Sequence, residues 1–313
     1  MSATVPNELA GKRLDQVLAI LFPEHSRARL QEWIRKGDVH INHGILSQRR
    51  RVKGGELVVI DTMHDEEDSW QAENIPLQII YEDKALLIIN KPAGIVVHPG
   101  AGNPRHTILN ALLHHDAGLK AVPRAGIIQR LDKDTSGLMV IARAPESHTR
   151  LTAEMQARKI KREYQAIVSG VMTGGGSIDL PIGRHPHKRT RMTVTQRGKP
   201  AVTHYRIKRK FPAHTHILVQ LETGRTHQIR VHLAHLRHPL VGDPVYGVRR
   251  SLPRGLSPTL AEALQSFHRQ ALHAHALTLR HPVTHETLDF KSPLPEDMMH
   301  LLNMLDTDAR QQS

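Results

Sequence analysis

The stretch GIIQRLDKDTSGLMVIAR, residues 126–143, places Asp132 between Arg130 and Lys133 with apolar residues on both sides. Apolar blocks around a short polar segment predict a strand, a loop that holds Asp132, and a second strand. A loop carboxylate beside basic residues is most often a solvated or structural ion pair. The alternative is a carboxylate that is kept ionised and aimed at a substrate.

The charge of the chain indicates a polyanionic partner. Its 313 residues include 43 Lys and Arg against 30 Asp and Glu, which gives a net charge of +13 and a pI of about 10.2. Such a surplus is typical of nucleic-acid-binding proteins, and an anionic membrane surface is the weaker alternative. The sequence has neither a run of 18 apolar residues nor the apolar core of a signal peptide. We therefore expect a cytoplasmic protein that has no membrane partner.

The residue types that are missing exclude several kinds of chemistry. There is no cysteine, which excludes disulfides, thiolate zinc sites and thiol nucleophiles and fits a reducing compartment. Neither a G-x-x-x-x-G-K-[ST] loop nor a G-x-G-x-x-G loop is present. His232, His235 and His238 are spaced three apart, but no acid accompanies them. We therefore expect neither a metal site nor a cofactor.

Charge also divides the chain into two predicted domains. Residues 62–73, TMHDEEDSWQAE, carry acids without Lys or Arg, and such a stretch between patterned regions predicts a linker. Residues 1–61 then form a small domain, and residues 74–313 form a larger one. Because the larger part has no regular alternation of strands and helices, we expect an α+β fold around a large, mainly antiparallel mixed sheet rather than a doubly wound sheet.

The N-terminal 61 residues predict two helices and two short strands. An apolar helical period covers 14–21, and Ser26 is a predicted N-cap of a second helix that runs through Ile34, with Gly37 as its C-terminal stop. Residues 39–41 and 57–60 read as strands.

Basic side chains on these two helices predict a face that contacts phosphates, although a solvated helix surface is the alternative. They are Arg13, Arg27, Arg29, Arg35 and Lys36. The block resembles the S4 RNA-binding domain in RLDQVLA, in SRARLQEWIRKGDVHIN and in the trailing GGE.

A second basic region lies in the larger part of the chain. Residues 182–210 contain ten Lys or Arg and no acid. The alternating segment RTRMTVT predicts a strand that has Arg189, Arg191, Thr193 and Thr195 on one face, as a ribbon that faces phosphates. An exposed strand face without a ligand is the alternative.

Three short stretches contain the candidate catalytic residues: QRLDKDTSGL, KREYQA with Tyr164, and ETGRTHQIRVHL with Arg225 and Arg230. Taken singly, Tyr164 could be a core tyrosine with a bonded hydroxyl, and Arg230 a cation on a helix surface. As an ordered set they resemble the pseudouridine synthase family, in its bacterial large-subunit ribosomal RNA branch. Gln129 stands where that family usually has His, and a glutamine cannot carry a charge.

The resemblance implies isomerisation of uridine to pseudouridine in 23S ribosomal RNA. The uracil leaves its N1 glycosidic bond, rotates and reattaches through C5, a reaction that needs no cofactor. Asp132 would be the nucleophile toward C1′ of the ribose or C6 of the uracil. Arg230 would hold that carboxylate through its planar fork, and Tyr164 would lie against the flipped base and provide the route for proton removal.

The resemblance also implies how the substrate is bound. Arg130 would fill the place that the base leaves or hold the neighbouring phosphate, and Arg225 would contact the substrate. The implied target is the stem-loop known as helix 69, bound by a monomer, as naked RNA or within the assembling large subunit. Two alternatives stay open: a synthase of the same branch with another ribosomal or transfer RNA target, and a non-catalytic RNA-binding assembly factor.

Overall fold

The computed structural model describes residues 1–313 except 23–26, 42–43, 46–49, 62–69, 101, 189, 248–251, 254 and 312–313. The predicted N-cap Ser26 and the basic residue Arg189 therefore lie outside the described residues. Arg27 and Arg29 are described as helical, but their side chains are not. Contacts divide the chain into two units, Met1–Ser69 and Trp70–Ser313, which we describe separately.

The smaller unit contains two helices and a four-stranded sheet. The helices are α1 (Leu14–Leu21) and α2 (Arg27–Lys36), after the 3-10 turn η1 (Asn7–Leu9), and the strands are β1 (Ser2–Thr4), β2 (Val39–Ile41), β3 (Gly44–Ile45) and β4 (Leu57–Ile60). The strand order is β1-β4-β2-β3. Leu14, Val17 and Leu18 are fully buried in its core, so the predicted apolar period is confirmed. Gly37 follows α2 with a φ of 87°, a left-handed conformation that suits glycine at a helix end.

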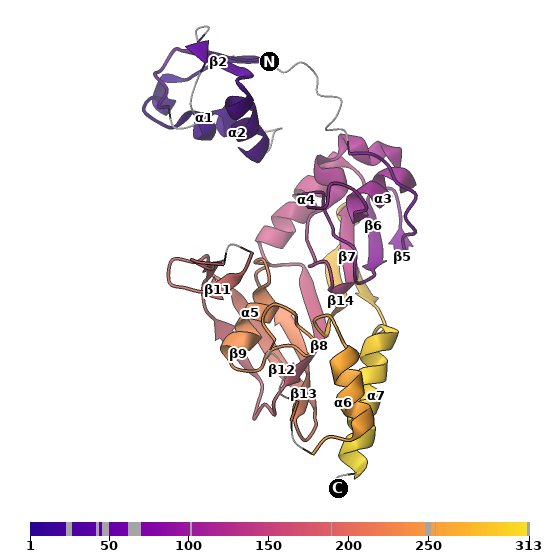
Figure 1. The fold of residues 1–313 in the computed structure, drawn as a ribbon. Helices are drawn as coiled ribbons and strands as arrows, with labels where there is room; N and C mark the ends of the chain where they lie inside the picture. The colour runs from indigo at the N-terminus through magenta and orange to yellow at the C-terminus, as the bar shows by residue number, and fades with distance from the viewer. Residues whose placement is uncertain are drawn as a thin grey trace. The chain divides into compact units, whose positions relative to one another are not determined.

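The larger unit is built on a nine-stranded sheet of order β5-β6-β7-β14-β8-β13-β12-β9, with β15 paired to β14 (Figure 1). Its strands are β5 (Ile79–Glu82), β6 (Leu86–Lys91), β7 (Ser136–Ala142), β8 (Lys161–Ser169), β9 (Gly176–Asp179), β12 (Val202–Lys210), β13 (His214–Leu221), β14 (Leu272–Arg280) and β15 (Thr287–Lys291). Within the described part of the sheet, β14 and β7 pair in parallel and the other pairs are antiparallel. The predicted α+β class is confirmed.

Helices cover both faces of the β6–β7 end of the sheet. They include α3 (Ile108–His115) and α4 (Pro145–Gln156), with 3-10 turns η3 (Ala117–Ala121) and η4 (Pro123–Gly126) between them. Leu87 and Ile89 pack with residues of α3, whereas Leu86 and Ile88 pack with Leu151 of α4. An unbroken apolar strand such as LLII is expected where both faces of a sheet are buried.

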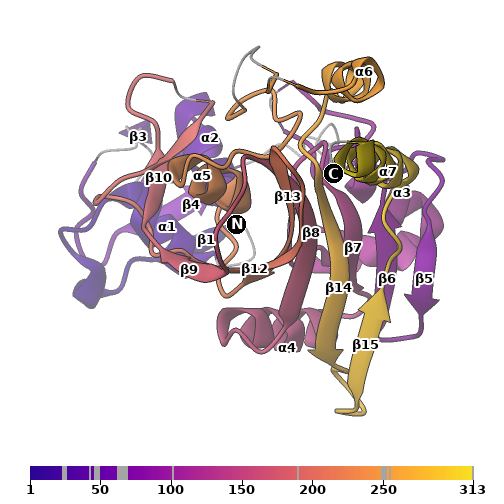
Figure 2. The same cartoon turned by 90° about the horizontal axis from the view of Figure 1, so that it is seen from below.

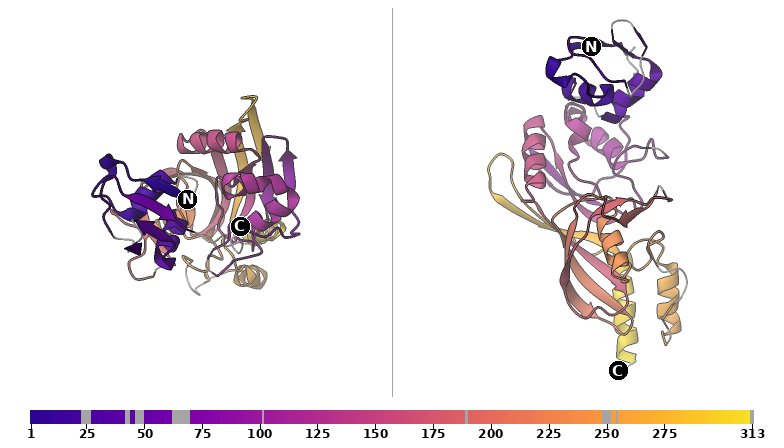
Figure 3. Two further views of the ribbon diagram at one scale, coloured as in Figure 1. Left: turned by 90° about the horizontal axis from the view of Figure 1, so that it is seen from above. Right: turned by 90° about the vertical axis from the view of Figure 1, so that its left-hand side faces the viewer.

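The opposite end of the sheet curves toward β9, and α5 (Gln228–His235) lies within that curve (Figures 2 and 3). A two-stranded ribbon of β10 (Ile182–Arg184) and β11 (Met192–Val194) contacts α5. The chain ends with α6 (Pro258–Ser266) and α7 (Glu296–Gln311), which pack against each other and against Ile167 and Phe211. No helix among the described residues is long and apolar enough to cross a membrane.

The segment before Asp132 is not a strand, so the predicted strand–loop–strand is wrong in its first half. Residues 126–131 make one isolated bridge, between Ile127 and Ile141. Arg124, Ala125 and Gly126 have φ values of 56°, 51° and 78°, and this left-handed run prevents a regular strand from starting there. Asp132 therefore lies in a loop that runs from η4 directly into β7.

Contacts at the start of the larger unit include residues of the predicted linker. The carbonyl of Gln71 accepts a hydrogen bond from the Asn110 side chain at 2.7 Å, and the Glu73 amide donates to the Asn110 carbonyl at 3.0 Å. The boundaries 1–61, 62–73 and 74–313 stay a prediction.

Candidate active site

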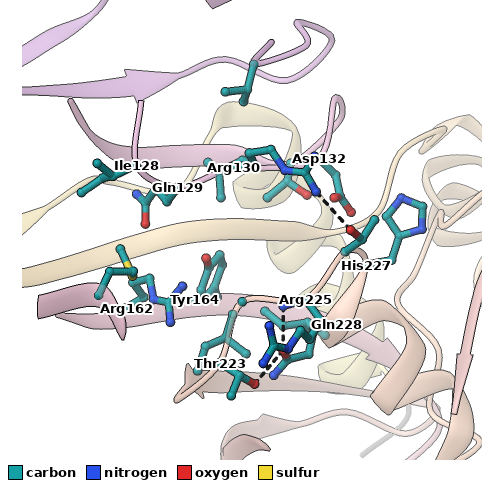
Figure 4. Close-up of a pocket in the computed structure, with 18 of the residues that line it drawn as sticks. Ile128, Gln129, Arg130, Asp132, Arg162, Tyr164, Thr223, Arg225, His227 and Gln228 are labelled. Atoms are coloured by element: carbon teal, nitrogen blue, oxygen red, sulfur yellow. Dashed lines mark hydrogen bonds between the residues drawn. The ribbon is translucent and has the colours of Figure 1, made fainter. Parts of the chain in front are cut away.

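A pocket of about 650 Å³ in the larger unit brings five predicted site residues together. They are Arg130, Asp132, Tyr164, Arg225 and Arg230. Figure 4 shows the first four of them on separate segments, namely the loop before β7, strand β8, and the turn between β13 and α5, and Arg230 follows in α5 itself. The fold thus joins three stretches that are far apart in sequence.

The turn between β13 and α5 is fixed by the side chain of Gln228. Its Oε1 accepts hydrogen bonds from the Thr223 hydroxyl at 2.8 Å and from the Arg225 amide at 2.9 Å. Its Nε2 donates to the Val202 carbonyl and the Thr203 hydroxyl. Because Gln228 is the first residue of α5, these bonds orient the first helical turn, which carries Arg230.

Arg230 links two carboxylates. Its Nη1 donates to Oδ2 of Asp132 at 2.9 Å, while Nε and Nη2 donate to the two carboxylate oxygens of Asp243 at 2.7 and 2.9 Å. The prediction that the planar fork grips Asp132 is therefore wrong. The fork faces Asp243 because the chain returns after α5 in a turn that buries this carboxylate completely, and Asp132 receives the remaining nitrogen.

Asp243 is held as an anion by its surroundings. Its Oδ1 also accepts from the backbone amides of Val245 and Tyr246 at 2.8 and 3.0 Å. Burial by itself would raise the pKa of Asp243, but Arg230 and these two amides lower it overall. Burial likewise opposes the charge of Arg230, and the two carboxylates outweigh it and raise the pKa of the guanidinium.

Asp132 keeps one carboxylate oxygen available. Its Oδ2 is bonded to Arg230, whereas Oδ1 accepts no hydrogen bond from any described residue, and 24% of the side chain is exposed. Arg230 can therefore orient the carboxylate without blocking it. A nucleophile needs access to the pocket and an oxygen that no donor occupies, and Oδ1 of Asp132 meets both conditions.

Tyr164 is a buried wall of the pocket. It is 6% exposed and packs in the main core cluster of the larger unit. Its hydroxyl has no hydrogen-bond partner among the described residues, which argues against the reading of a core tyrosine with a bonded hydroxyl. Burial, and to a smaller degree the charge of Asp132, raises the pKa of this hydroxyl, while Arg162 lowers it.

Gln129 also lines the pocket and is 8% exposed. Its Nε2 donates to the Leu138 carbonyl at 3.3 Å, and its Oε1 is buried without a partner among the described residues. The orientation of the Gln129 amide is thus set by the backbone of β7.

The comparisons with known proteins agree with this geometry. Residues 85–235 match the family of RNA pseudouridylate synthases, and residues 12–58 match the S4 domain. The ribosomal large subunit pseudouridine synthase D of Pseudomonas aeruginosa is 53% identical over 307 residues, which cover 98% of this chain and 96% of that protein. Its counterpart in Escherichia coli K12 is 51% identical over 309 residues, or 98% and 95% of the two chains.

The chain belongs to the RNA pseudouridylate synthase family. A solved human structure, RNA Pseudouridylate Synthase Domain Containing 4, is 27% identical with a TM-score of 0.56, and the similarity covers 73% of this chain and 93% of that one. The protein is therefore an RNA pseudouridine synthase with an N-terminal S4 domain, as the sequence predicted.

Sequence reasoning missed two residues of this synthase that lie next to Arg230. Asp243 is one. Its signal in the sequence was the segment VGDPVYG, in which an acid stands just before a tight turn. The other is Tyr246, whose ring lies under the Arg230 guanidinium with 5.1 Å between the guanidinium carbon and the ring centroid. The Tyr246 hydroxyl is 2.8 Å from Nδ1 of His227 and accepts from the Met192 amide at 2.8 Å. It therefore connects strand β11 to the pocket.

Lys91 is a third missed residue, and it shapes the loop of Asp132. Although it ends the apolar strand β6, it is 1% exposed. Its ammonium donates to the carbonyls of Pro92, Ile95 and Lys133 at 2.7, 2.9 and 2.9 Å. Burial lowers the pKa of Lys91 to about 7, against the opposing charges of Asp134 and Asp132. The signal in the sequence was a lysine directly after the run LLIIN.

The remaining predicted RNA contacts lie outside the pocket or on its rim. Arg130 is exposed and donates to the Thr226 hydroxyl at 3.1 Å (dashed in Figure 4), and Arg225 donates to the Pro200 carbonyl at 3.0 Å. In the smaller unit Arg35 is exposed, Arg13 pairs with Asp15 at 3.0 Å and Lys36 lies 3.9 Å from Glu32.

The basic ribbon carries several cations. Among the residues described between positions 182 and 199, no ion pair with an acid occurs; its cations are Arg184, Lys188, Arg191, Arg197 and Lys199. The described strand β11 is limited to residues 192–194, so Arg191 precedes it. Within the described chain no group of three His, Asp or Glu side chains could hold a metal ion. His232 instead bonds the Thr203 hydroxyl and the Leu180 carbonyl, both at 2.9 Å.

Proposed function

We propose that the protein isomerises specific uridines of 23S ribosomal RNA to pseudouridine, with Asp132 as the nucleophile. The observation that carries the proposal is the hydrogen-bond chain from Asp243 through Arg230 to Asp132, which leaves Oδ1 of Asp132 free at the pocket. Relatives about half identical to this chain are named ribosomal large subunit pseudouridine synthase D, which supports the large ribosomal subunit as the source of the substrate. The net charge of +13 supports an RNA partner.

In the proposed mechanism the target uridine leaves its stack and enters the pocket. Oδ1 of Asp132 attacks C1′ of the ribose or C6 of the uracil, and the N1 glycosidic bond breaks. Arg230 keeps the carboxylate oriented, because two bonds to Asp243 leave its guanidinium little freedom to move. The uracil then turns and bonds to C1′ through C5.

Tyr164 would take part in the last step, the removal of the proton from C5. Because its pKa is raised, the phenol is protonated at neutral pH. It can take the proton from C5 only as it passes its own proton to another base. Once the covalent bond to Asp132 has broken, the released carboxylate would be the acceptor, since Asp132 and Tyr164 line the same pocket. The ring of Tyr164 would meanwhile lie against the base.

Arg130 and Arg225 would hold the RNA at the rim of the pocket, and the cations of the ribbon and of the S4 domain would bind phosphates further away. The proposal also includes helix 69 as the target stem-loop, a monomer as the active species and the cytoplasm as the location. The test in cells is a pseudouridine map of ribosomal RNA from a strain that lacks the protein. If pseudouridine were lost only at sites outside 23S RNA, the proposed target would be wrong.

The test of the mechanism is the variant Asp132→Asn, compared with Asp134→Asn in the same loop. An amide at position 132 can still accept from Arg230 but cannot form the covalent bond. We expect pseudouridine formation to fall by more than about a thousandfold, or ~4 kcal/mol of barrier, with RNA binding retained. Asp134 is not among the residues that line the pocket, so Asp134→Asn should retain activity. Near-normal turnover by Asp132→Asn would remove Asp132 from the mechanism.

A further inference from the structure

An aromatic and cationic patch adjoins the pocket through His98 and Arg124. Trp70 is 42% exposed, and its ring meets that of His98 edge to face with 5.5 Å between centroids. His98 in turn accepts a hydrogen bond at Nε2 from Nε of Arg124 at 3.1 Å. His98 and Arg124 both line the pocket. Tryptophan side chains are mostly buried in folded proteins, so the exposure of Trp70, one of only two in this chain, is unusual.

The charge of this patch is not neutralised within the described protein. Arg124 pairs with no carboxylate there, and both of its terminal nitrogens lack a described partner. Burial, and then Arg124 and Arg130, lower the pKa of His98 to about 4, so the imidazole is neutral and acts as an acceptor. Burial and Arg124 also lower the pKa of His148. The positive charges of Arg124 and Arg130 therefore have no carboxylate partner among the described residues.

Arg124, which lines the pocket, lies in a strained stretch of backbone. Arg124 and Ala125 have left-handed φ and ψ values of 56° and 35°, and 51° and 38°. Residues other than glycine rarely adopt this conformation, and two in succession persist only where the surroundings enforce it. Gly126 continues the run with a φ of 78° and packs so closely against β7 that a Cβ there would collide with the Ala142 carbonyl. Strain of this kind is concentrated at functional sites.

We propose that Trp70, His98 and Arg124 form a subsite for a single-stranded nucleotide next to the target uridine in the RNA. Trp70 stacks on the base of that nucleotide, and the two terminal nitrogens of Arg124 bind its phosphate. His98 is a positioning residue that holds Arg124 and supports the tryptophan ring. The inference rests on the proposed function, in which a uridine leaves its stack. The nucleotide beside it loses a stacking neighbour, and Trp70 replaces that neighbour.

The experiment uses the full-length protein and a helix 69 stem-loop that carries fluorescent 2-aminopurine at each loop position in turn. Trp70→Leu removes the aromatic face and Trp70→Phe keeps it. Arg124→Asn removes the charge with a residue that tolerates left-handed backbone, and Arg124→Lys keeps the charge. Arg237→Asn is the matched control, since Arg237 is exposed, has a φ of 64° and does not line the pocket.

Trp70→Leu should weaken binding about 5- to 100-fold and abolish the stacking signal at one loop position, while Trp70→Phe stays near wild type. Arg124→Asn should weaken binding and reduce the salt slope by about 0.7, unlike Arg124→Lys and Arg237→Asn. The rate at saturating RNA should change little, because the subsite acts on binding rather than on bond breaking. Wild-type affinity and an unchanged 2-aminopurine signal in Trp70→Leu and Arg124→Asn would overturn the subsite.

These binding measurements do not depend on product. A wild-type protein that binds the stem-loop without forming pseudouridine would refute the proposed target, and the comparison of the Trp70 and Arg124 variants would still decide the subsite. Equal weakening by Trp70→Phe and Trp70→Leu, or by Arg124→Asn and Arg237→Asn, would also count against it, because neither stacking nor a local phosphate contact would then explain the loss.

Discussion

Replacing Arg230 with methionine should destabilise the larger unit strongly, because it leaves Asp243 buried and unpaired. The Asp243 side chain is 0% exposed and loses two charge-assisted bonds, at 2.7 and 2.9 Å. Such bonds contribute about 1.5–3 kcal/mol each. Breaking a buried ion pair on one side costs about 3–5 kcal/mol. The two figures agree, so we expect the free energy of unfolding to fall by about 3–5 kcal/mol.

The loss should also depend on pH in a defined direction. In the wild type Arg230 and two amides lower the pKa of Asp243, so this carboxylate stabilises the fold above about pH 3.9 and loses that effect as the pH falls through the lower folded value. In Arg230→Met only the two amides oppose burial, which is the largest single influence on this carboxyl, and we expect its pKa to rise above the unfolded value. The unfolded carboxyl then ionises first, and the variant loses stability as the pH rises above about 4. Its deficit should therefore be larger at pH 7.5 than at pH 4.5.

Urea unfolding followed by circular dichroism at these two pH values measures the deficit in the transition of the larger unit. The control is Arg209→Met, since Arg209 is half exposed and pairs with Asp306 at 2.7 Å; it should cost no more than about 1 kcal/mol. A deficit in Arg230→Met that is equal at both pH values, or as small as that of the control, would refute the assignment of Asp243 as the stranded charge.

Three other outcomes are expected. Tyr164→Phe keeps the ring, so RNA binding should be retained while pseudouridine formation measured at saturating RNA falls severely; equal activity would require another base. Lys91→Met leaves the Pro92 and Ile95 carbonyls without a donor, while the Lys133 carbonyl keeps the Gly94 amide; it should cost about 2 kcal/mol or more in urea unfolding, and a loss below about 1 kcal/mol would show that water replaces the ammonium. A protein that starts at Trp70 should still isomerise uridine in a stem-loop at raised RNA concentration, and its affinity should depend less steeply on salt because S4-domain phosphate contacts are lost. An unchanged salt slope with unchanged affinity would mean that the S4 domain does not touch this RNA.

Local patterns in the sequence were sufficient for the elements and for most of the pocket. The apolar period of residues 14–21 is a property of neighbouring residues, and it predicts the same helix wherever that helix lies. The ordered motifs around Asp132, Tyr164 and Arg230 likewise indicated one shared pocket before any contact was visible. Local backbone conformation was harder, as the left-handed run at Arg124 shows, because nothing in PRAG states that Gly126 packs against the Ala142 carbonyl.

The sequence by itself determined which groups this protein has for its chemistry: a carboxylate, a tyrosine, three arginines and a basic surface, without thiols. Only the tertiary structure decided how they are paired. Arg230 could form its fork with Asp132, 98 residues away, or with Asp243, 13 residues away, and both lie within reach in the fold. Burial made the choice, because a fully buried carboxylate needs the stronger two-bond contact more than one that is 24% exposed. Burial is set by how α5 and the turn after it pack together, and no sequence spacing expresses that.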